Sequence, residues 1–384
     1  MSELRIAMLG YKFMGKAHSN AFCRVTQFFD PKVRPGMAVV CGRNEAGARA
    51  LADRFGWQEV STDWKETVNR PDIDVVDVVA PGNLHLPMVL EAARAGKAII
   101  CEKPLANTLK EARTMLAAVK KAKVLHSLIH NSRFVPAVSL AKQFIKEGKL
   151  GRLFHWRSVY LQDWIVDPKF PMVWRLDKKQ SGSGALGDIA AHSIDLARFL
   201  VGEIDEVSGM TETFIKERSI PASMEGLVAE AGRGKAKVTV DDAALFLARF
   251  KNGVIGSFEA SRFATGRKNF NGFEINGEKG SLVFNFEDMN RLKYYDRTQP
   301  GREQGFRDIM VTEGSHPYAG HWWPAGHIIG YEHGFVHQIY EILNAFAAGK
   351  SPVPNFEDGV RNQEVLEAVE RSARIRRWVT TSQV

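Results

Sequence analysis

The chain has 384 residues, of which 45% are hydrophobic and 25% charged, and its formal net charge is +8 at pH 7. This length exceeds that of a typical single core, so we expect two domains of ordinary globular composition. No apolar run approaches the ~20 residues that span a bilayer. The densest basic clusters, 120–123 and 374–377, lie on expected amphipathic helices, which favours solvated helix faces over a nucleic-acid surface.

The first third of the chain alternates short apolar runs with helical patterns. Residues 75–80 form a β-branched run, typical of a strand buried on both faces of a parallel sheet. The pattern predicts strands at 4–9, 37–41, 75–80, 98–101 and 124–129, and helices at 14–22, 45–55, 85–95 and 109–121. This β-α-β rhythm predicts an α/β domain over residues 1–130, a doubly wound parallel sheet of the Rossmann type that binds a dinucleotide.

The pattern changes after residue 130. Residues 277–280 are a turn signal between two strand-like runs, and few helices intervene between the strands. We expect strands at 153–161, 207–214, 243–250, 253–262, 271–276 and 281–285, and helices at 136–147, 188–200, 333–347 and 360–374. Residues 131–384 are therefore predicted to form an α+β domain with a large, mostly antiparallel open sheet for substrate binding and oligomerisation.

Three scattered cysteines provide neither a disulfide framework nor a clustered zinc site. His333 and His337 are spaced for one helix face, but no third ligand has diagnostic spacing, so no metal is expected. The first residues also lack the basic and long apolar regions of a signal peptide. Together these features predict a cytoplasmic protein.

A phosphate-binding loop is expected where the first strand meets the first helix. Backbone N–H groups and a helix dipole hold a pyrophosphate at such a junction. The loop reads Gly10, Tyr11, Lys12, Phe13, Met14, Gly15. Lys12 occupies the place of the second glycine of the usual motif, where we expect its ammonium to reach a phosphate rather than to prop the loop open.

The end of the second strand bears on the choice of dinucleotide. An acidic residue there accepts hydrogen bonds from a ribose 2′-hydroxyl and indicates NAD. Residues 42–44 contain no acid, and Arg43 could face a 2′-phosphate. The sequence therefore leaves NAD and NADP both open, with a slight preference for NADP.

Two segments suggest the chemistry. Lys103 lies at the carboxyl end of a strand, where open α/β sheets bind ligands, and Pro104 restricts its backbone. Asp188 and His192 are four residues apart, hence on one helix face. Such a set can remove a proton from a hydroxyl while a cofactor takes the hydride. Asp195 continues this stripe, and we expect it to be a structural cap or salt-bridge partner rather than a catalyst.

The chain resembles the Gfo/Idh/MocA family of sugar oxidoreductases from residue 6 to its end. The resemblance is carried by the segments 102–104, 174–175, 187–195, 274–280, 324–327, 330–332, 358–359 and 368–369. Within the family, residues 13–19 and 160–164 are most similar to the levoglucosan dehydrogenase-like glycoside 3-dehydrogenases. The resemblance implies an NAD(P)-dependent dehydrogenase that oxidises a ring hydroxyl, at C3, of a glucoside-like or anhydro sugar, in a homodimer or homotetramer.

The resemblance also implies residue roles. Lys103 would stabilise the alkoxide, His192 would act as general base, and Asp188 would orient the substrate. The sugar pocket would be lined by Arg133, Gln162, Asp163 and His327. The cofactor would be bound by Gly10, Lys12, Phe13, Met14, Gly15, Arg43, Pro81, Asn83, His85, Glu102, Lys103, Trp174 and Arg175.

Two positions depart from the family pattern: Lys12, and Gly82 where an asparagine commonly follows the proline. Two alternatives remain open, the second of which these departures would permit. One is an enzyme that cleaves a glycoside through transient NAD-dependent oxidation at C3. The other is a sugar-responsive or assembly subunit that has lost cofactor binding, although the retained Lys103, Asp188 and His192 argue against it.

Overall fold

The computed structural model describes residues 2–225 and 228–384. By packing, the chain divides into two compact units: the first comprises 1–131 and 331–363, and the second comprises 132–330 and 364–384. The division at 130 therefore coincides with a change of unit, while the segment 331–363 packs with the first unit rather than with the rest of 131–384.

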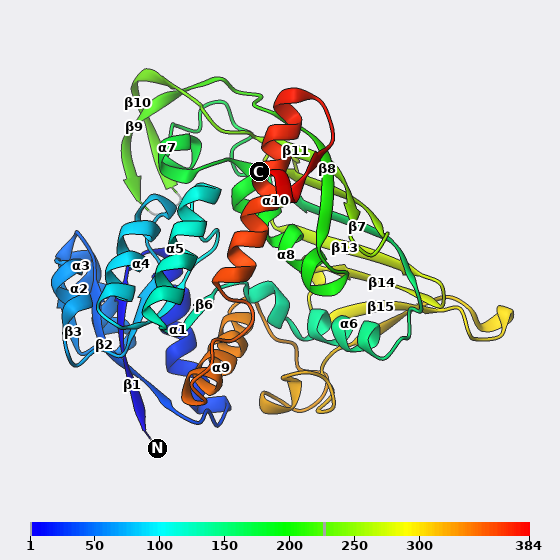
Figure 1. Ribbon diagram of the computed structural model, residues 1–384, viewed down its shortest axis with the longest axis horizontal. Helices are drawn as coiled ribbons and strands as arrows, with labels where there is room; N and C mark the ends of the chain where they lie inside the picture. Colours follow the sequence, from blue (N-terminus) through cyan, green and yellow to red (C-terminus); the bar gives the residue numbers. More distant parts are fainter. Residues whose placement is uncertain (1, 226–227) are drawn as a thin grey trace. The chain divides into compact units, whose positions relative to one another are not determined.

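Within the described residues, the first unit is built on a six-stranded sheet in the order β3-β2-β1-β4-β5-β6, with every pairing parallel. The strands are β1 (Glu3–Leu9), β2 (Arg34–Cys41), β3 (Glu59–Ser61), β4 (Val75–Val78), β5 (Ala98–Cys101) and β6 (His126–Leu128). Their order is that of a doubly wound nucleotide-binding sheet, which confirms the predicted fold class (Figure 1). All four residues of β4 are buried, as expected of a strand covered on both faces.

The helices of this unit connect and cover the parallel strands. They are α1 (Phe13–Phe28), α2 (Glu45–Phe55), α3 (Trp64–Asn69), α4 (His85–Arg94), α5 (Leu109–Ala122) and α9 (His333–Ala347), followed by the start of α10 (Phe356–Ile375). Local signals fix their ends: Asn44 caps α2, and Thr108 forms a capping box with Glu111 at the start of α5. Helix α9 packs on α1, so this late segment completes the first unit.

The second unit, where described, contains a nine-stranded sheet in the order β16-β15-β14-β13-β7-β12-β11-β8-β17. Its strands are β7 (Leu153–Leu161), β8 (Ile204–Glu212), β11 (Ala243–Phe250), β12 (Ile255–Ser261), β13 (Phe270–Gly277), β14 (Gly280–Asn285), β15 (Arg291–Asp296), β16 (Phe306–Met310) and β17 (Val379–Thr380). Only the β12–β7 pair is parallel among these described strands, which confirms the predicted mostly antiparallel sheet.

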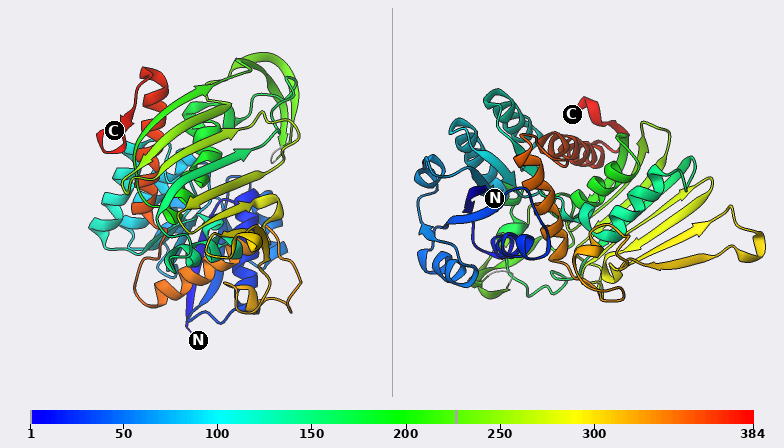
Figure 2. Two further views of the ribbon diagram at one scale, coloured as in Figure 1. Left: turned by 90° about the vertical axis from the view of Figure 1, so that its right-hand side faces the viewer. Right: turned by 90° about the horizontal axis from the view of Figure 1, so that it is seen from below.

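One face of this sheet is buried beneath α6 (Pro136–Lys146) and α8 (Ala191–Leu200), while the other is open (Figure 2). Trp156 and Phe258 point into the core on the covered face. Leu245 and Leu247 alternate with buried neighbours along β11 and lie on the open face. A separate hairpin of β9 (Glu217–Glu225) and β10 (Val228–Lys237) and the short helix α7 (Lys178–Ser181) complete the unit.

Candidate active site

The loop between β1 and α1 has the close backbone packing of a phosphate-binding turn. Gly10 has φ +125°, and a Cβ there would lie 2.9 Å from the backbone oxygen of Val79. A Cβ on Gly15 would lie 2.7 Å from the carbonyl oxygen of Gly10. Lys12 is exposed at the start of α1, whose first turn carries no acid to compete for an anion. These residues therefore fit the pyrophosphate of a dinucleotide.

Tyr11 fills the space beside the end of β2, a role that the sequence did not reveal. A Cβ on Gly42 would lie 2.2 Å from the Tyr11 ring, and one on Gly47 would lie 2.6 Å from it. The two glycines therefore let an aromatic ring lie against the β2–α2 turn. Arg43 is exposed beside them, and the Asn44 side chain accepts a hydrogen bond from the Gly47 N–H at 2.8 Å.

The turn after β4 contains Gly82, one departure from the family pattern. A Cβ on Gly82 would lie 2.5 Å from Oδ1 of Asn107, so a side chain at this position requires Asn107 to move. Pro81 and Asn83 flank it. His85 is only 1% exposed, and its ring nitrogens lie 2.9 to 3.1 Å from the carbonyl oxygens of residues 80, 104 and 105. Its ring therefore joins two loops and has no nitrogen left for a cofactor.

Glu102 and Lys103 follow β5 directly. The Glu102 side chain is 4% exposed, and its Oε2 accepts a hydrogen bond from the Lys103 backbone N–H at 2.9 Å. Its other oxygen faces His18. The Glu102 carboxylate is thus turned into the protein, while Lys103 is half-buried.

In the second unit, Asp188 and His192 lie on one turn of an otherwise buried helix. Residues 184–198 are all buried except these two, so both can face a ligand. The helix begins with a π-helical segment, Leu186–Ala190, and such turns are frequent at functional sites. The His192 imidazole lies 3.5 Å from the Ser132 hydroxyl and near the Tyr160 ring.

Arg262 is a site residue that sequence reasoning missed. It is fully buried, and its Nη2 donates to Oδ2 of Asp188 at 2.7 Å. Its Nε and Nη1 have no partner in the structure although both are buried. Burial lowers the pKa of the nearby Arg175 guanidinium, and the Asp188 charge opposes that change. Arg175 also stacks on Trp174, with 4.3 Å between the guanidinium carbon and the ring centroid.

The structure gives the expected sugar-lining residues several partners within the protein. Arg133 donates to both carboxylate oxygens of Asp195, at 2.7 and 2.6 Å, and both side chains are buried. This ion pair confirms the structural role expected for Asp195. Asp163 is bound by Lys268 at 2.8 Å, while Gln162 accepts from the Trp164 indole N–H and donates to Asn269.

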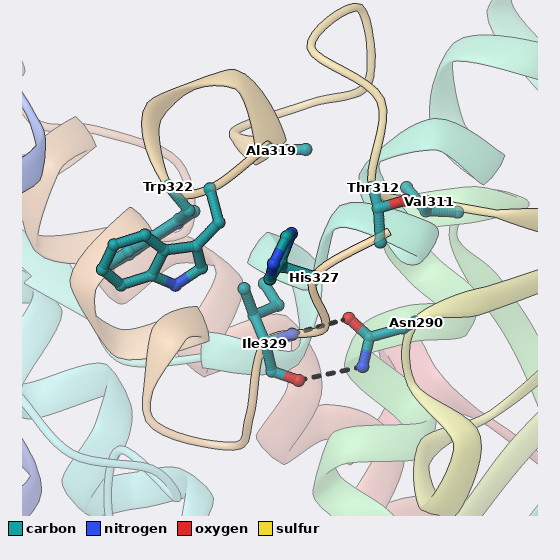
Figure 3. Close-up of a pocket in the computed structure, with 8 residues that line it drawn as sticks. Asn290, Val311, Thr312, Ala319, Trp322, His327 and Ile329 are labelled. Carbon is teal, nitrogen blue, oxygen red and sulfur yellow. Dashed lines mark hydrogen bonds between the residues drawn. The ribbon is translucent and has the colours of Figure 1, made fainter. Parts of the chain in front are cut away.

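His327 lies in a small hollow of the second unit and belongs to no helix or strand (Figure 3). Its Nδ1 donates to the Pro324 carbonyl oxygen at 2.8 Å, which leaves Nε2 as the acceptor nitrogen of a neutral ring. The hollow is lined by Asn290, Val311, Thr312, Ala319, Trp322, Trp323, His327 and Ile329. Asn290 shapes it by two hydrogen bonds to the Ile329 backbone, at 2.9 and 3.0 Å.

Within residues 2–225 and 228–384, no cluster of three or more His, Cys, Asp or Glu side chains has the geometry to hold a metal ion. In the same ranges, no helix is both long enough and apolar enough to cross a membrane.

Comparison with known proteins agrees with this geometry. Residues 4–130 match the oxidoreductase family model with an NAD-binding Rossmann fold, and residues 138–283 match the GFO/IDH/MocA C-terminal domain. The chain is 41% identical over all of its length to levoglucosan dehydrogenase of Pseudarthrobacter phenanthrenivorans, which it covers completely. The chain belongs to the GFO/IDH/MocA oxidoreductase family. It is an oxidoreductase with an NAD-binding domain, as the resemblance implied.

Solved structures show the same similarity over the full length of the chain. A Kribbella flavida oxidoreductase domain protein is 49% identical with a TM-score of 0.94, covering 99% of this chain and 100% of its own. Levoglucosan dehydrogenase in complex with NADH and levoglucosan is 40% identical, also with a TM-score of 0.94, over 100% of both chains. Because that relative was solved with NADH, the preference for NADP drawn from Arg43 gains no support.

Proposed function

We propose that the protein is an NAD⁺-dependent sugar dehydrogenase that oxidises a ring hydroxyl, at C3, of levoglucosan or a similar anhydro sugar or glucoside. The full-length similarity to levoglucosan dehydrogenase carries this proposal. The segment 184–198, in which only Asp188 and His192 are partly exposed, supports it, because it offers a base and a carboxylate together.

NAD⁺, when bound, supplies the acceptor for the hydride that leaves the carbinol carbon. His192 takes the hydroxyl proton at an imidazole nitrogen as the carbonyl forms. The Lys103 ammonium stabilises the negative charge that develops on the oxygen. Asp188, held by Arg262, accepts a hydrogen bond from a neighbouring sugar hydroxyl and orients the ring.

The remaining assignments follow the same reasoning. The loop of Gly10, Lys12, Phe13, Met14 and Gly15 is proposed to bind the pyrophosphate. Arg43, Pro81, Asn83, Trp174 and Arg175 are proposed to surround the rest of the dinucleotide. Gln162, Asp163 and His327 are proposed to line the sugar pocket. Arg133 and His85 are better suited to positions behind the site, because their polar atoms are occupied within the protein.

We further propose a homo-oligomer formed through the open face of the nine-stranded sheet. Met210, Leu245, Leu247 and Ile255 are 64%, 42%, 54% and 51% exposed, and the strand registers place them on neighbouring strands. Such an apolar patch is typical of a subunit contact. Light scattering on the protein and on Leu247→Lys would test it, since the variant should dissociate. The free thiols fit a reducing cytoplasm.

The catalytic assignment is tested by Lys103→Ala and His192→Ala. Each variant should lose sugar-dependent NADH formation by a factor of about 100 or more, as expected for loss of an electrostatic or acid–base group. NADH binding, measured by the fluorescence of the dinucleotide, should persist. Unimpaired turnover in both variants would overturn the assignment.

A further inference from the structure

The first unit buries three ionisable side chains in one cluster outside the proposed catalytic set. His18 lies in α1, Asp77 lies in the middle of the sheet on β4, and Glu102 follows β5. Their exposed fractions are 0%, 0% and 4%. Nδ1 of His18 lies 2.8 Å from Oδ2 of Asp77, and Nε2 lies 3.1 Å from Oε1 of Glu102.

With both carboxyl groups ionised, this geometry requires a doubly protonated imidazole. Burial raises the pKa of Asp77, and the charge and hydrogen bond of His18 oppose that rise. A neutral histidine has one N–H, so one ring nitrogen would turn a lone pair toward a carboxylate oxygen. Burial alone lowers the pKa of His18, but the charges and hydrogen bonds of Asp77 and Glu102 outweigh it and raise the pKa to about 10. The rings of Phe22 and Phe335 pack against the imidazole and exclude water from it.

A continuous chain of contacts runs from this cluster to Lys103. Glu102 receives the His18 N–H on one carboxylate oxygen and the Lys103 backbone N–H on the other. Both oxygens are therefore fixed, and with them the backbone from which the lysine side chain projects. On the far side of Lys103, the His85 ring bonds the carbonyl oxygens of Pro104 and Leu105.

Stability alone is a poor explanation for such a cluster. Replacing buried ion groups by well-packed apolar residues is often neutral or stabilising by about 1–4 kcal/mol. The cluster holds one cation between two carboxylates, and one Asp77 oxygen remains without a partner although buried. Burying this cluster costs desolvation energy, and the cluster is hydrogen-bonded directly to the Lys103 backbone. We therefore expect it to position Lys103.

We propose that His18, as a permanent imidazolium clamped between Asp77 and Glu102, is a positioning residue that sets the place of Lys103 for hydride transfer. This inference rests on the proposed function only in naming Lys103 as the group that is positioned. The protonation state of His18 and its contacts with Asp77 and Glu102 do not depend on that function.

The first test reads the protonation state without turnover. In protein labelled with ¹⁵N-histidine at pH 8, both ring nitrogens of His18 should give imidazolium signals, with assignment by their loss in His18→Gln. Resolved signals showing one unprotonated nitrogen in His18 would overturn the proposal. If His18→Gln does not fold, the signals that move in Glu102→Gln provide the assignment.

The second test is a kinetic cycle with levoglucosan and NAD⁺. The amide introduced by Glu102→Gln has an NH₂ donor in place of one carboxylate oxygen, so either the His18 or the Lys103 N–H would face another donor. His18→Gln and Glu102→Gln should each lower kcat by about 10–100-fold, the usual cost of a misplaced catalytic group. The Kd for NADH should stay within about threefold, and the double variant should lose no more than the worse single variant.

A matched control is His126→Gln. His126 is also buried in the first unit, but its Nδ1 accepts from the Phe356 N–H at 3.3 Å, and burial lowers its pKa to about 4, so it is neutral. Its loss should cost stability but leave kcat within about twofold. A folded His18→Gln protein with unchanged kcat, or losses that multiply in the double variant, would overturn the positioning role. If wild type turns over no sugar while His18 is doubly protonated, the proposed function fails and the clamp stands.

Discussion

The Arg133–Asp195 pair provides a quantitative test of how the second unit is held together. The two side chains are 4% and 1% exposed and form two hydrogen bonds of 2.7 and 2.6 Å. Removing one partner of a buried pair costs about 3–5 kcal/mol, because the other charge stays buried without compensation. A domain of this size loses about 2–4 °C in Tm per kcal/mol. Arg133→Ala or Asp195→Ala should therefore lower the Tm of the second unit by roughly 6–20 °C.

Calorimetry on the single variants and on the double variant Arg133→Met/Asp195→Leu measures this directly. The double variant removes both charges, keeps similar volume and retains an aliphatic chain against Phe199, over which the guanidinium now lies at 5.1 Å. It should recover most of the lost stability. Single variants that lose less than about 1 kcal/mol would refute the reasoning. A stable double variant whose KM for levoglucosan rises more than about tenfold would show that Arg133 instead binds the sugar.

Three further outcomes are expected. The pKa of His18 is raised from 6.5 to about 10, so the stability contributed by the charged ring is complete below pH 6.5 and is lost as pH rises through 10. Urea titrations between these pH values should show the free energy of unfolding falling by about 1 kcal/mol per pH unit. The His18→Gln variant should not show this fall. Arg262→Met leaves Asp188 without this ion-pair partner, so kcat should fall about tenfold or more with a shifted pH–rate profile, and an unchanged profile would argue against the pair. Gly42→Ala forces the Tyr11 ring away, so NADH should bind at least about tenfold more weakly in a fluorescence titration.

The control for the last variant is Gly305→Ala. A Cβ at Gly305 meets nothing within 4 Å, so NADH affinity should not change. An equal change in NADH affinity in the two glycine variants would show that the position of the Tyr11 ring does not affect dinucleotide binding.

Most strands of the first sheet could be predicted because they carry strong local signals. The buried, valine-rich segment 75–78 and the apolar run at 98–101 are typical of strands in a parallel sheet. Strand β3 has three residues and α3 has six, too few for any period to show, and both were missed. Strand β16 is exposed at nearly every position, so its sequence lacks the alternation of apolar and polar residues that predicts a strand.

The candidate site was predictable only in part. Asp188 and His192 could be paired from spacing within one helix. Arg262 could not, because its partner Asp188 lies 74 residues away and only the folded chain brings them together. For the buried cluster a signal existed: Asp77 interrupts an apolar run buried on both faces, where a charge needs a partner. The sequence alone does not say that the partner is His18.

Sugar dehydrogenase activity is measured by the absorbance at 340 nm when the purified protein is mixed with NAD⁺ and levoglucosan. Absorbance should rise steadily as NADH forms, should depend on both compounds, and should not rise with Lys103→Ala or His192→Ala. Methyl glucosides and an acidic glucoside, each with NAD⁺ or NADP⁺, complete the panel. No rise with any pair, from protein that binds NADH and is folded, would contradict a sugar dehydrogenase.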